Sequence, residues 1–269
     1  MGDVLAYHGV TQWRFSTRAS RLAGYSASAF VTSDGILVDT GIPARAREFE
    51  RLLDATTIHA VMVTHYHEDH AGNVELAARR GIPIWMAPAT RALVTSVAPI
   101  GVYRRLTWHS MRPLRSRTNE YIPDLLQPIA APGHCADHHV MWHPASRTLF
   151  SADLFLGVAV RIAHRDEDLW ASLESLDAMV ALEPARMFCA HRGLVPSPVE
   201  ALRAKAAWTR ELIDTISTRI TRGDTDAQIL NSVMSGESLT GRASFGEYSR
   251  QNFIRAVRLR IVVPDGGNG

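Results

Sequence analysis

The stretch 64–70, with the sequence THYHEDH, constrains the fold of this 269-residue chain more than any other feature. The apolar run 60–63 before it predicts a buried strand, and residues 71–80 after it, closed by Gly81, predict a helix. The metal-ligand types in the stretch therefore stand on a turn between a strand and a helix. Such a turn lies at the end of a sheet, where α/β folds place functional sites.

The spacing of the ligand types within this turn favours two adjacent metal ions over one. In an extended chain His65, His67 and Asp69 share one side, because successive side chains alternate. His70 faces another way, since the chain is turning into the helix there. Glu68, between the ligand types, is expected to face solvent.

The composition is that of a soluble globular protein with one sizeable core, since 46% of the residues are apolar and 21% are charged. A net charge of +2 without a basic block argues against nucleic acid as a partner. The first residues lack the pattern of a signal peptide, and no apolar run reaches the ~18–20 residues that span a membrane. Two cysteines, Cys135 and Cys189, form no disulfide framework; we expect buried thiols in a cytoplasmic protein.

Alternating strand and helix patterns in two stretches, roughly 1–125 and 126–195, predict the architecture. Besides the strand and helix around the ligand turn, they comprise a hairpin that turns at Asp34-Gly35, helices over 43–53, 90–97 and 169–182, and strands over 82–86, 127–131, 138–142, 148–152 and 187–190. The simplest arrangement is an α/β fold in which two mixed sheets pack face to face with helices outside.

The domain organisation is predicted from where this alternation ends. Residues 1–197 are expected to form the domain that carries the ligand turn, and the helical pattern over 198–262 a C-terminal extension packed on it. The tail 263–269 is expected to be disordered. The segment 98–127 has three prolines and no readable periodicity, so it is read as a solvated connector, with a mobile loop over the site and a dimer contact as alternatives.

Ligand-type residues also follow three later predicted strands, as His134, Asp153 and His191. Imidazole and carboxylate groups suit Zn²⁺ and similar divalent ions. With the ligand turn they make five histidines and two carboxylates, which is too many for one tetrahedral ion but suits a pair. Two such ions lie about 3.5–4 Å apart, polarise a carbonyl and lower the pKa of bound water towards about 7.

The pattern His-x-His-x-Asp-His at 65–70, followed by Gly133-His134, Asp153 and His191, resembles the metallo-β-lactamase-fold hydrolase superfamily. Asp39-Thr40-Gly41 is similar to the strand-end acid of that family. The resemblance covers about residues 20–195. It implies a four-layer αββα sandwich with a C-terminal helical extension, in which residues 1–197 are the catalytic domain.

The resemblance also implies two zinc ions per chain, with iron or manganese as alternatives. The ligands to the first ion would be His65, His67 and His134, those to the second Asp69, His70 and His191, and the bridging ligand Asp153. Asp69 would in addition act in catalysis, by orienting the attacking water.

This ligand set implies a bacterial-type metal hydrolase in which a metal-bridging hydroxide attacks a small acyl substrate, namely a thioester, ester, lactone or lactam. A bridging Asp153 is similar to glyoxalase-II-like thioesterases and lactonases rather than to true β-lactamases, and Leu156 stands where the lactonases carry a tyrosine. A β-lactamase and a mononuclear iron persulfide dioxygenase are the alternatives. The expected partner is a small-molecule substrate, without nucleic acid or membrane, and a homodimer is one assembly that the resemblance allows.

Four residues near the ligands carry weaker predictions. Asp39 and His138 are expected to contact ligands without binding metal, because such partners orient the ligand rings. Tyr66 and Arg192 are candidates for contact with the substrate.

Overall fold

The computed structural model describes residues 3–7 and 9–262, which fall into two units. The first unit consists of Met1–Ala131, Asp137–Asp153 and Pro184–Pro198, and the second of Pro132–Ala136, Leu154–Glu183 and Val199–Gly269. The predicted disordered tail 263–269 lies outside the described residues. The predicted domain boundary at residue 197 stays a prediction.

Six strands of the first unit form one sheet, in the order β1-β2-β3-β4-β5-β6. They are β1 (Val4–Tyr7), β2 (Val10–Phe15), β3 (Ala27–Thr32), β4 (Ile36–Val38), β5 (Ala60–Met62) and β6 (Ile84–Trp85). Neighbours from β1 to β4 are antiparallel, whereas β4, β5 and β6 are parallel. The predicted β3–β4 hairpin is confirmed. Its turn requires Gly35, because φ is +73° there and a side chain would strike His59.

Five further strands form a second sheet, in the order β12-β11-β9-β8-β7. They are β7 (Gln127–Ala130), β8 (His139–His143), β9 (Thr148–Ala152), β11 (Arg186–Cys189) and β12 (Gly193–Val195). β9 and β11 pair in parallel, and the other neighbours pair antiparallel. No strand was predicted after the one over 187–190, but the structure has one in β12. β12 adds an edge to the sheet, and its three residues are too few for periodicity to reveal.

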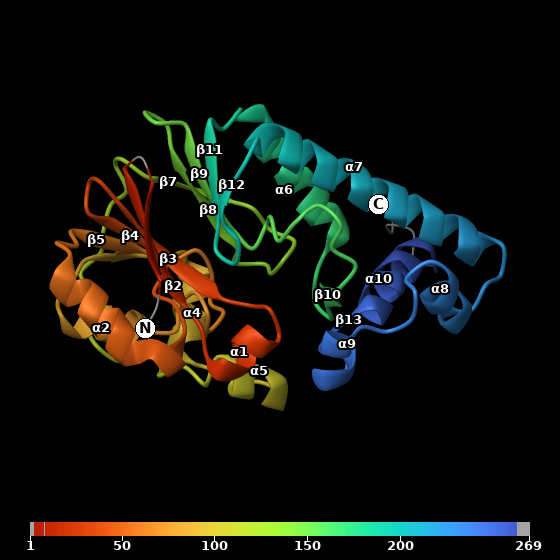
Figure 1. The fold of residues 1–269 in the computed structure, drawn as a ribbon, viewed down its shortest axis with the longest axis horizontal. Helices are drawn as coiled ribbons and strands as arrows, with labels where there is room; N and C mark the ends of the chain where they lie inside the picture. Colours follow the sequence, from red (N-terminus) through yellow and green to blue (C-terminus); the bar gives the residue numbers. More distant parts are fainter. Residues whose placement is uncertain (1–2, 8, 263–269) are drawn as a thin grey trace, which may run out of the picture. The chain divides into compact units, whose positions relative to one another are not determined.

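The two sheets pack face to face through apolar side chains, as predicted (Figure 1). The ring of Phe30 in the first sheet lies 5.6 Å from that of Phe150 and 5.4 Å from that of Phe188, both in the second sheet. Val38 and Met62, the last residues of β4 and β5, belong to the same buried cluster. The core therefore reaches the sheet edge from which the ligand turn emerges.

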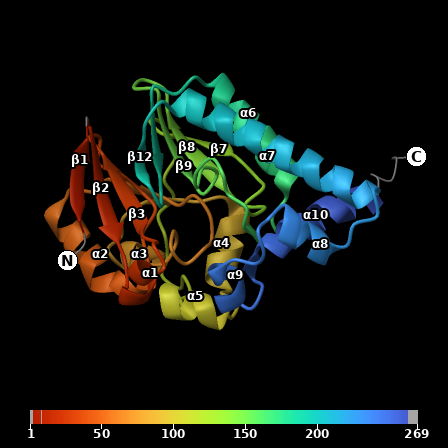
Figure 2. The same cartoon turned by 45° about the vertical axis from the view of Figure 1, so that its right-hand side comes forward.

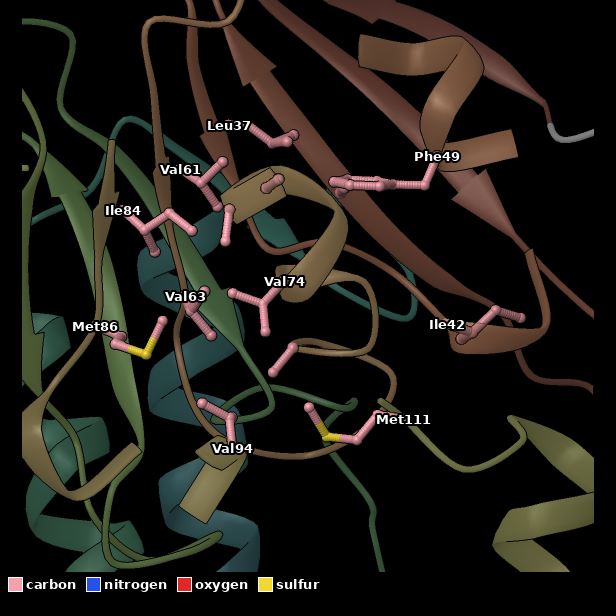
Figure 3. Packing of buried hydrophobic residues seen from close by; sticks show 14 of the residues in the cluster. Leu37, Ile42, Phe49, Val61, Val63, Val74, Ile84, Met86, Val94 and Met111 are labelled. Atoms are coloured by element: carbon pink, nitrogen blue, oxygen red, sulfur yellow. The ribbon is translucent and has the colours of Figure 1, made fainter. Parts of the chain in front are cut away.

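Helices of the first unit pack on the outer face of the first sheet. Of these helices, α2 (Ala46–Ala55), α3 (Val74–Arg79) and α4 (Pro88–Thr95) carry residues of a buried cluster that they share with the sheet, and the short helices α1 (Arg18–Leu22) and η1 (Pro43–Arg45) precede them in the chain. Figure 3 shows Phe49 of α2 and Val74 of α3 turned towards Leu37 and Val61 of the sheet, within one buried cluster. α3 begins three residues later than predicted, because residues 71–73 still belong to the turn.

The segment 98–127 is not a solvated connector throughout. It contains the helix α5 (Val102–Thr107), which the sequence did not predict, and Met111 and Leu114 are buried in the outer core. After them, the carboxylate of Glu75 on α3 accepts the N–H groups of Arg115 and Ser116 over 2.9 and 3.1 Å. The segment is thus tied to the helix that follows the ligand turn.

The second unit is mainly helical (Figure 2). Its elements are α6 (Leu169–Ala181), α7 (Pro198–Thr221, whose first residue belongs to the first unit), α8 (Asp226–Ser232), α9 (Leu239–Ala243), α10 (Arg250–Val262) and the antiparallel pair of β10 (Ala163–His164) and β13 (Tyr248–Ser249). The predicted helix over 169–182 is confirmed, and α7 confirms the start of the helical pattern predicted over 198–262. Within the described residues, no helix has both the length and the apolar character that crossing a membrane requires.

Candidate metal centre

Strand ends in the first unit carry most of the predicted site residues. Asp39 follows β4, the turn 64–70 follows β5, Asp153 follows β9, and His191 lies two residues after β11. β4 and β5 are parallel, as are β9 and β11, so each pair of carboxyl ends meets at one sheet edge. Asp39 and Ala152, which precedes Asp153, have left-handed backbones, with φ of +62° and +44°. Such strain in residues other than glycine is typical of functional sites.

Asp69, His70 and His191 bring their ligand atoms together around Asp153. Asp153 Oδ1 lies 3.3 Å from His70 Nε2 and 3.1 Å from His191 Nε2. Asp69 Oδ2 lies 3.4 Å from His191 Nε2 and 3.9 Å from His70 Nε2. These are the three residues predicted to hold the second ion, together with the predicted bridging carboxylate.

His65 and His67 form the adjoining group. His65 Nε2 lies 3.1 Å from His67 Nδ1, and the ligand atoms of His65, His70 and Asp153 all lie within 4.8 Å of one another. The ring centroids of His65 and His70 are 4.1 Å apart. Asp153 is therefore within reach of both groups, as a carboxylate that bridges two ions must be.

His134 belongs to the second unit, where its Nδ1 lies 3.1 Å from Glu167 Oε1. Glu167 also accepts the backbone N–H of His164 over 2.8 Å. Because a carboxylate only accepts, the ring donates through Nδ1 and keeps Nε2 for a metal. Sequence reasoning missed Glu167, since an acid in the loop before α6 has no diagnostic spacing. The assignment of His134 to the first ion stays a prediction.

Asp39 holds two of the predicted ligand rings in the orientation that metal binding needs. Its Oδ2 lies 2.7 Å from His70 Nδ1, so that nitrogen donates and Nε2 keeps its lone pair. The hydroxyl of Thr64 lies 3.0 Å from both Asp39 oxygens and 3.0 Å from His65 Nδ1. Its single proton goes to Asp39, so His65 Nδ1 donates to Thr64 and His65 Nε2 is also left as a ligand. No pattern in the sequence indicates this role for Thr64.

The remaining ring contacts complete the same pattern. His191 Nδ1 donates to the carbonyl of Ser26 over 2.7 Å, which leaves Nε2 facing Asp153 and Asp69. His138 uses both of its nitrogens within the first unit: Nδ1 donates to Ala131 O over 2.9 Å, and Nε2 accepts the N–H of Asp153 over 3.2 Å. His138 therefore positions the backbone of Asp153 and is not placed to bind metal.

The electrostatics of the first unit favour a cation among these side chains. Burial lowers the pKa of His191, but Asp153 and Asp69 outweigh it and raise that pKa to about 9. The pKa of His70 is also raised, because Asp153, Asp39 and Asp69 together outweigh burial. His70 Nε2 is buried, and no described group hydrogen-bonds to it, although Asp153 Oδ1 is 3.3 Å away. Imidazole nitrogens facing carboxylates around an orphaned nitrogen fit a divalent metal ion.

The expectation that Glu68 faces solvent is wrong. Its side chain is 3% exposed and pairs with Arg104 of α5, which is 7% exposed. Burial raises the pKa of Glu68, and Arg104 opposes that rise. Alternation along a strand cannot reveal this contact, since the partner lies 36 residues further along the chain.

Four other predicted positions differ in their surroundings. Tyr66 is half-buried beside the ring of His67, and its N–H donates to the buried carboxylate of Asp137 over 3.0 Å. Arg192 is exposed. Cys189 is buried, as expected, and its sulfur accepts the N–H of His191 over 3.4 Å. Cys135 is only partly buried, so the expectation of a buried thiol is wrong there.

Comparison with known proteins identifies a common family. A family model described as the metallo-beta-lactamase superfamily matches residues 23–191. The chain is similar to a beta-lactamase-like protein 2 homolog of Caenorhabditis elegans, with 29% identity covering 61% of this chain and 54% of the relative. It is also similar to a hydroxyacylglutathione hydrolase-like protein of Gallus gallus, with 30% identity covering 68% and 65%. The chain thus spans less than two thirds of the length of these relatives.

The solved structures bear on the fold alone. A metallo-beta-lactamase from Pontibacter korlensis superposes with a TM-score of 0.60 at 15% identity, covering 78% of this chain and 99% of that one. The predicted α/β sandwich fold is thereby confirmed.

Proposed function

Because this chain belongs to the metallo-beta-lactamase superfamily, we propose that it is a dinuclear zinc hydrolase acting on a small acyl substrate. The observation that carries the proposal is the convergence of Asp69, His70, Asp153 and His191, whose ligand atoms lie 3.1–3.9 Å apart. When bound, zinc supplies an electrophile for the substrate carbonyl and lowers the pKa of water towards about 7.

The residues divide the work as their contacts suggest. Asp69, His70 and His191 would hold one ion, His65 and His67 would hold the other together with His134, and Asp153 would be shared. Asp39, Thr64 and the carbonyl of Ser26 hold the ring protons on the far side of the histidines. The rings are thus oriented with Nε2 towards the proposed ions, which would displace the proton that the raised pKa values of His70 and His191 retain. Asp69 is proposed to orient the attacking water through its second oxygen.

A thioester is the proposed substrate class among the acyl compounds. Two considerations support it. The relative from Gallus gallus is named a hydroxyacylglutathione hydrolase-like protein, and an acylglutathione is a thioester. The carboxylate of Asp153 also lies between the two ligand groups, which fits the bridging position of the thioesterase-like ligand set.

The test of the substrate class is a panel on zinc-reconstituted protein. The panel comprises an acylglutathione thioester, a lactone, a phosphodiester and a β-lactam, each measured as kcat/KM. We expect the thioester to be cleaved fastest. Preference for the phosphodiester or the β-lactam would contradict the proposal, and oxygen consumption with a persulfide by iron-containing protein would support the dioxygenase alternative instead.

The test of the metal centre is mutation of its proposed ligands. His65→Ala and Asp153→Ala should each lose bound zinc, measured by emission spectrometry, and nearly all hydrolytic activity. His59→Ala is the matched control, because His59 is exposed and belongs to no ligand group. Full zinc content and unchanged turnover in either ligand variant would refute the proposed centre.

A further inference from the structure

We propose that the buried ion pair of Arg104 and Glu68, called here the Arg104–Glu68 brace, holds the ligand turn in its metal-binding geometry. The inference rests on the proposed metal centre and assigns a positioning role to two residues outside the ligand set. Glu68 lies between His67 and Asp69 in the chain, and each of these is a proposed ligand to a different ion. A side chain that fixes Glu68 therefore fixes one neighbour in each half of the centre.

The contact itself has the geometry of a clamp. Arg104 Nε donates to Glu68 Oε1 over 2.6 Å, and Arg104 Nη2 donates to Glu68 Oε2. Two parallel bonds between a planar guanidinium and a planar carboxylate set orientation as well as distance. Both side chains are almost fully buried, so solvent screens the pair little.

The exposure pattern of α5 shows that this contact is not a by-product of apolar burial. On this helix Leu106 is 65% exposed and Val102 is 52% exposed, whereas Arg104 is buried. The hydrophobic effect alone would favour the opposite arrangement. A buried ion pair is also weak evidence of net stability, because desolvation of the two charges offsets their attraction. Burial of a charged side chain while its apolar neighbours face solvent departs from the usual pattern. Beside a cluster of proposed ligands, that departure points to a role in positioning.

The segment that carries Arg104 is itself anchored. The carbonyl of Thr107 accepts the hydroxyl of Thr17 over 2.9 Å, and the carbonyl of Trp108 accepts the N–H of Ala44 over 3.1 Å. The Trp108 ring lies 6.3 Å from the ring of His191. The Arg104–Glu68 brace thus connects the ligand turn to an anchored segment that also lies beside the proposed ligand His191.

The main chain of the turn is held from its other side. A side chain at Gly72 would strike the carbonyl oxygens of Glu68 and Gly41, so these backbone segments are in close contact. Close packing fixes the backbone of Glu68, and the brace fixes its side chain. The turn is therefore clamped at the residue between the two groups of ligands.

The experiment separates positioning from charge by measuring zinc affinity in chelator competition for Arg104→Met, Glu68→Gln and the double variant. If the brace sets geometry, both single variants lose affinity by about 10-fold or more, and the double variant stays weak. If only charge matters, the single variants change affinity in opposite directions, and the double variant returns to the wild-type value. The second pattern would overturn the proposal.

Two further readouts keep the test decisive. The visible absorption bands of Co²⁺-substituted protein report ligand geometry, and they should change in both single variants. Arg104→Lys keeps the charge without the fork, so it should recover only part of the affinity, and it serves if Arg104→Met does not fold. A lower melting temperature with unchanged zinc affinity and Co²⁺ spectrum would show that the pair is merely structural.

The control uses a second ion pair of the same chemistry. Arg80 pairs with Asp54 over 2.5 Å, but at 39% and 62% exposure and without a ligand neighbour. Arg80→Met should leave zinc affinity unchanged, because exposed pairs contribute little. A wild-type chain that binds no zinc would refute the proposed function. A wild type that binds zinc no more tightly than the brace variants would refute only the brace.

Discussion

Two carboxylates, one in each unit, hold the Nδ1 of a predicted ligand histidine, and they do so in different surroundings. Asp39 contacts His70 over 2.7 Å, and its side chain is 3% exposed. Glu167 contacts His134 over 3.1 Å, and its side chain is 17% exposed. Asp39 also reaches His65 through the hydroxyl of Thr64, whereas Glu167 shares its carboxylate with the backbone of His164.

The difference indicates what determines how strongly a carboxylate behind a ligand histidine affects metal binding. A buried acceptor has no water to replace a lost partner, so changing it leaves unsatisfied groups in the core. A partly exposed acceptor can be replaced by water at lower cost. Asp39 also serves two rings, which are assigned to different ions. The comparison therefore predicts that Asp39 controls both ions and Glu167 only one.

Replacement of Asp39 by Asn should have the largest effect. The NH₂ group of the asparagine side chain is a donor. It would face either the Nδ1–H of His70 or the N–H and hydroxyl donors of Thr64, so one hydrogen bond would be lost. We expect zinc affinity to fall by about 100-fold for both equivalents. Chelator competition with two resolved binding steps measures this. A loss of affinity in only one binding step would contradict the comparison, because Asp39 would then affect one ion only, as Glu167 is expected to do.

Replacement of Thr64 by Val separates the two branches of the Asp39 network. The substitution keeps the shape of the side chain but removes the hydroxyl that links His65 to Asp39, while the contact with His70 stays intact. We expect one of the two zinc equivalents to weaken by about 10-fold or more. The same chelator competition measures this effect. Equal weakening of both zinc equivalents would show that the two branches are not separable.

Replacement of Glu167 by Gln should have a smaller effect. The amide oxygen can still accept from His134, and water can serve the N–H of His164 because the site is partly exposed. We expect a loss of no more than about 10-fold, in one equivalent only. A loss as large as that of Asp39→Asn would mean that burial does not set the influence of these acids.

Replacement of Glu75 by Gln should leave zinc affinity unchanged, because this carboxylate contacts no ligand. Burial opposes its ionisation, but bonds from Arg115, Ser116 and Arg79 hold its pKa at about 2, against an ordinary value of 4.5. Because this carboxyl has a lower pKa in the folded chain than in the unfolded chain, its ionised form stabilises the fold above pH 4.5. This contribution is lost as the pH falls towards 2. Urea unfolding should therefore show a loss of about 2 kcal/mol at pH 7, which shrinks below pH 4.5. A variant as stable as wild type at pH 7 would contradict the assignment.

Much of the fold and of the ligand set was accessible from the chain alone. The strand before 64–70, the hairpin at Gly35 and the helix over 169–182 each follow from local periodicity or turn chemistry, and the face-to-face sheets are the simplest arrangement of such elements. The short elements were missed, because α5 and β12 have too few residues to show a period. The prediction for Glu68 was wrong for another reason. Alternation of side chains applies to a strand, but Glu68 lies in a turn, where the direction of a side chain depends on its tertiary contacts.

The order and chemistry of residues along the chain were enough to specify the α/β class and to nominate seven metal ligands. The class follows from local periodicity, and the ligands follow from residue types at the ends of predicted strands, in an order that resembles a known family. The folded molecule decided which atoms face one another. It placed Asp39 behind two rings, assigned a proton to Thr64, joined Glu167 to His134 and paired Glu68 with Arg104. These contacts join residues between 25 and 36 positions apart, or depend on ring orientation, except for that of Thr64 with its neighbour His65. Burial then gives them their strength, and burial is a property of the packed core rather than of any stretch of sequence.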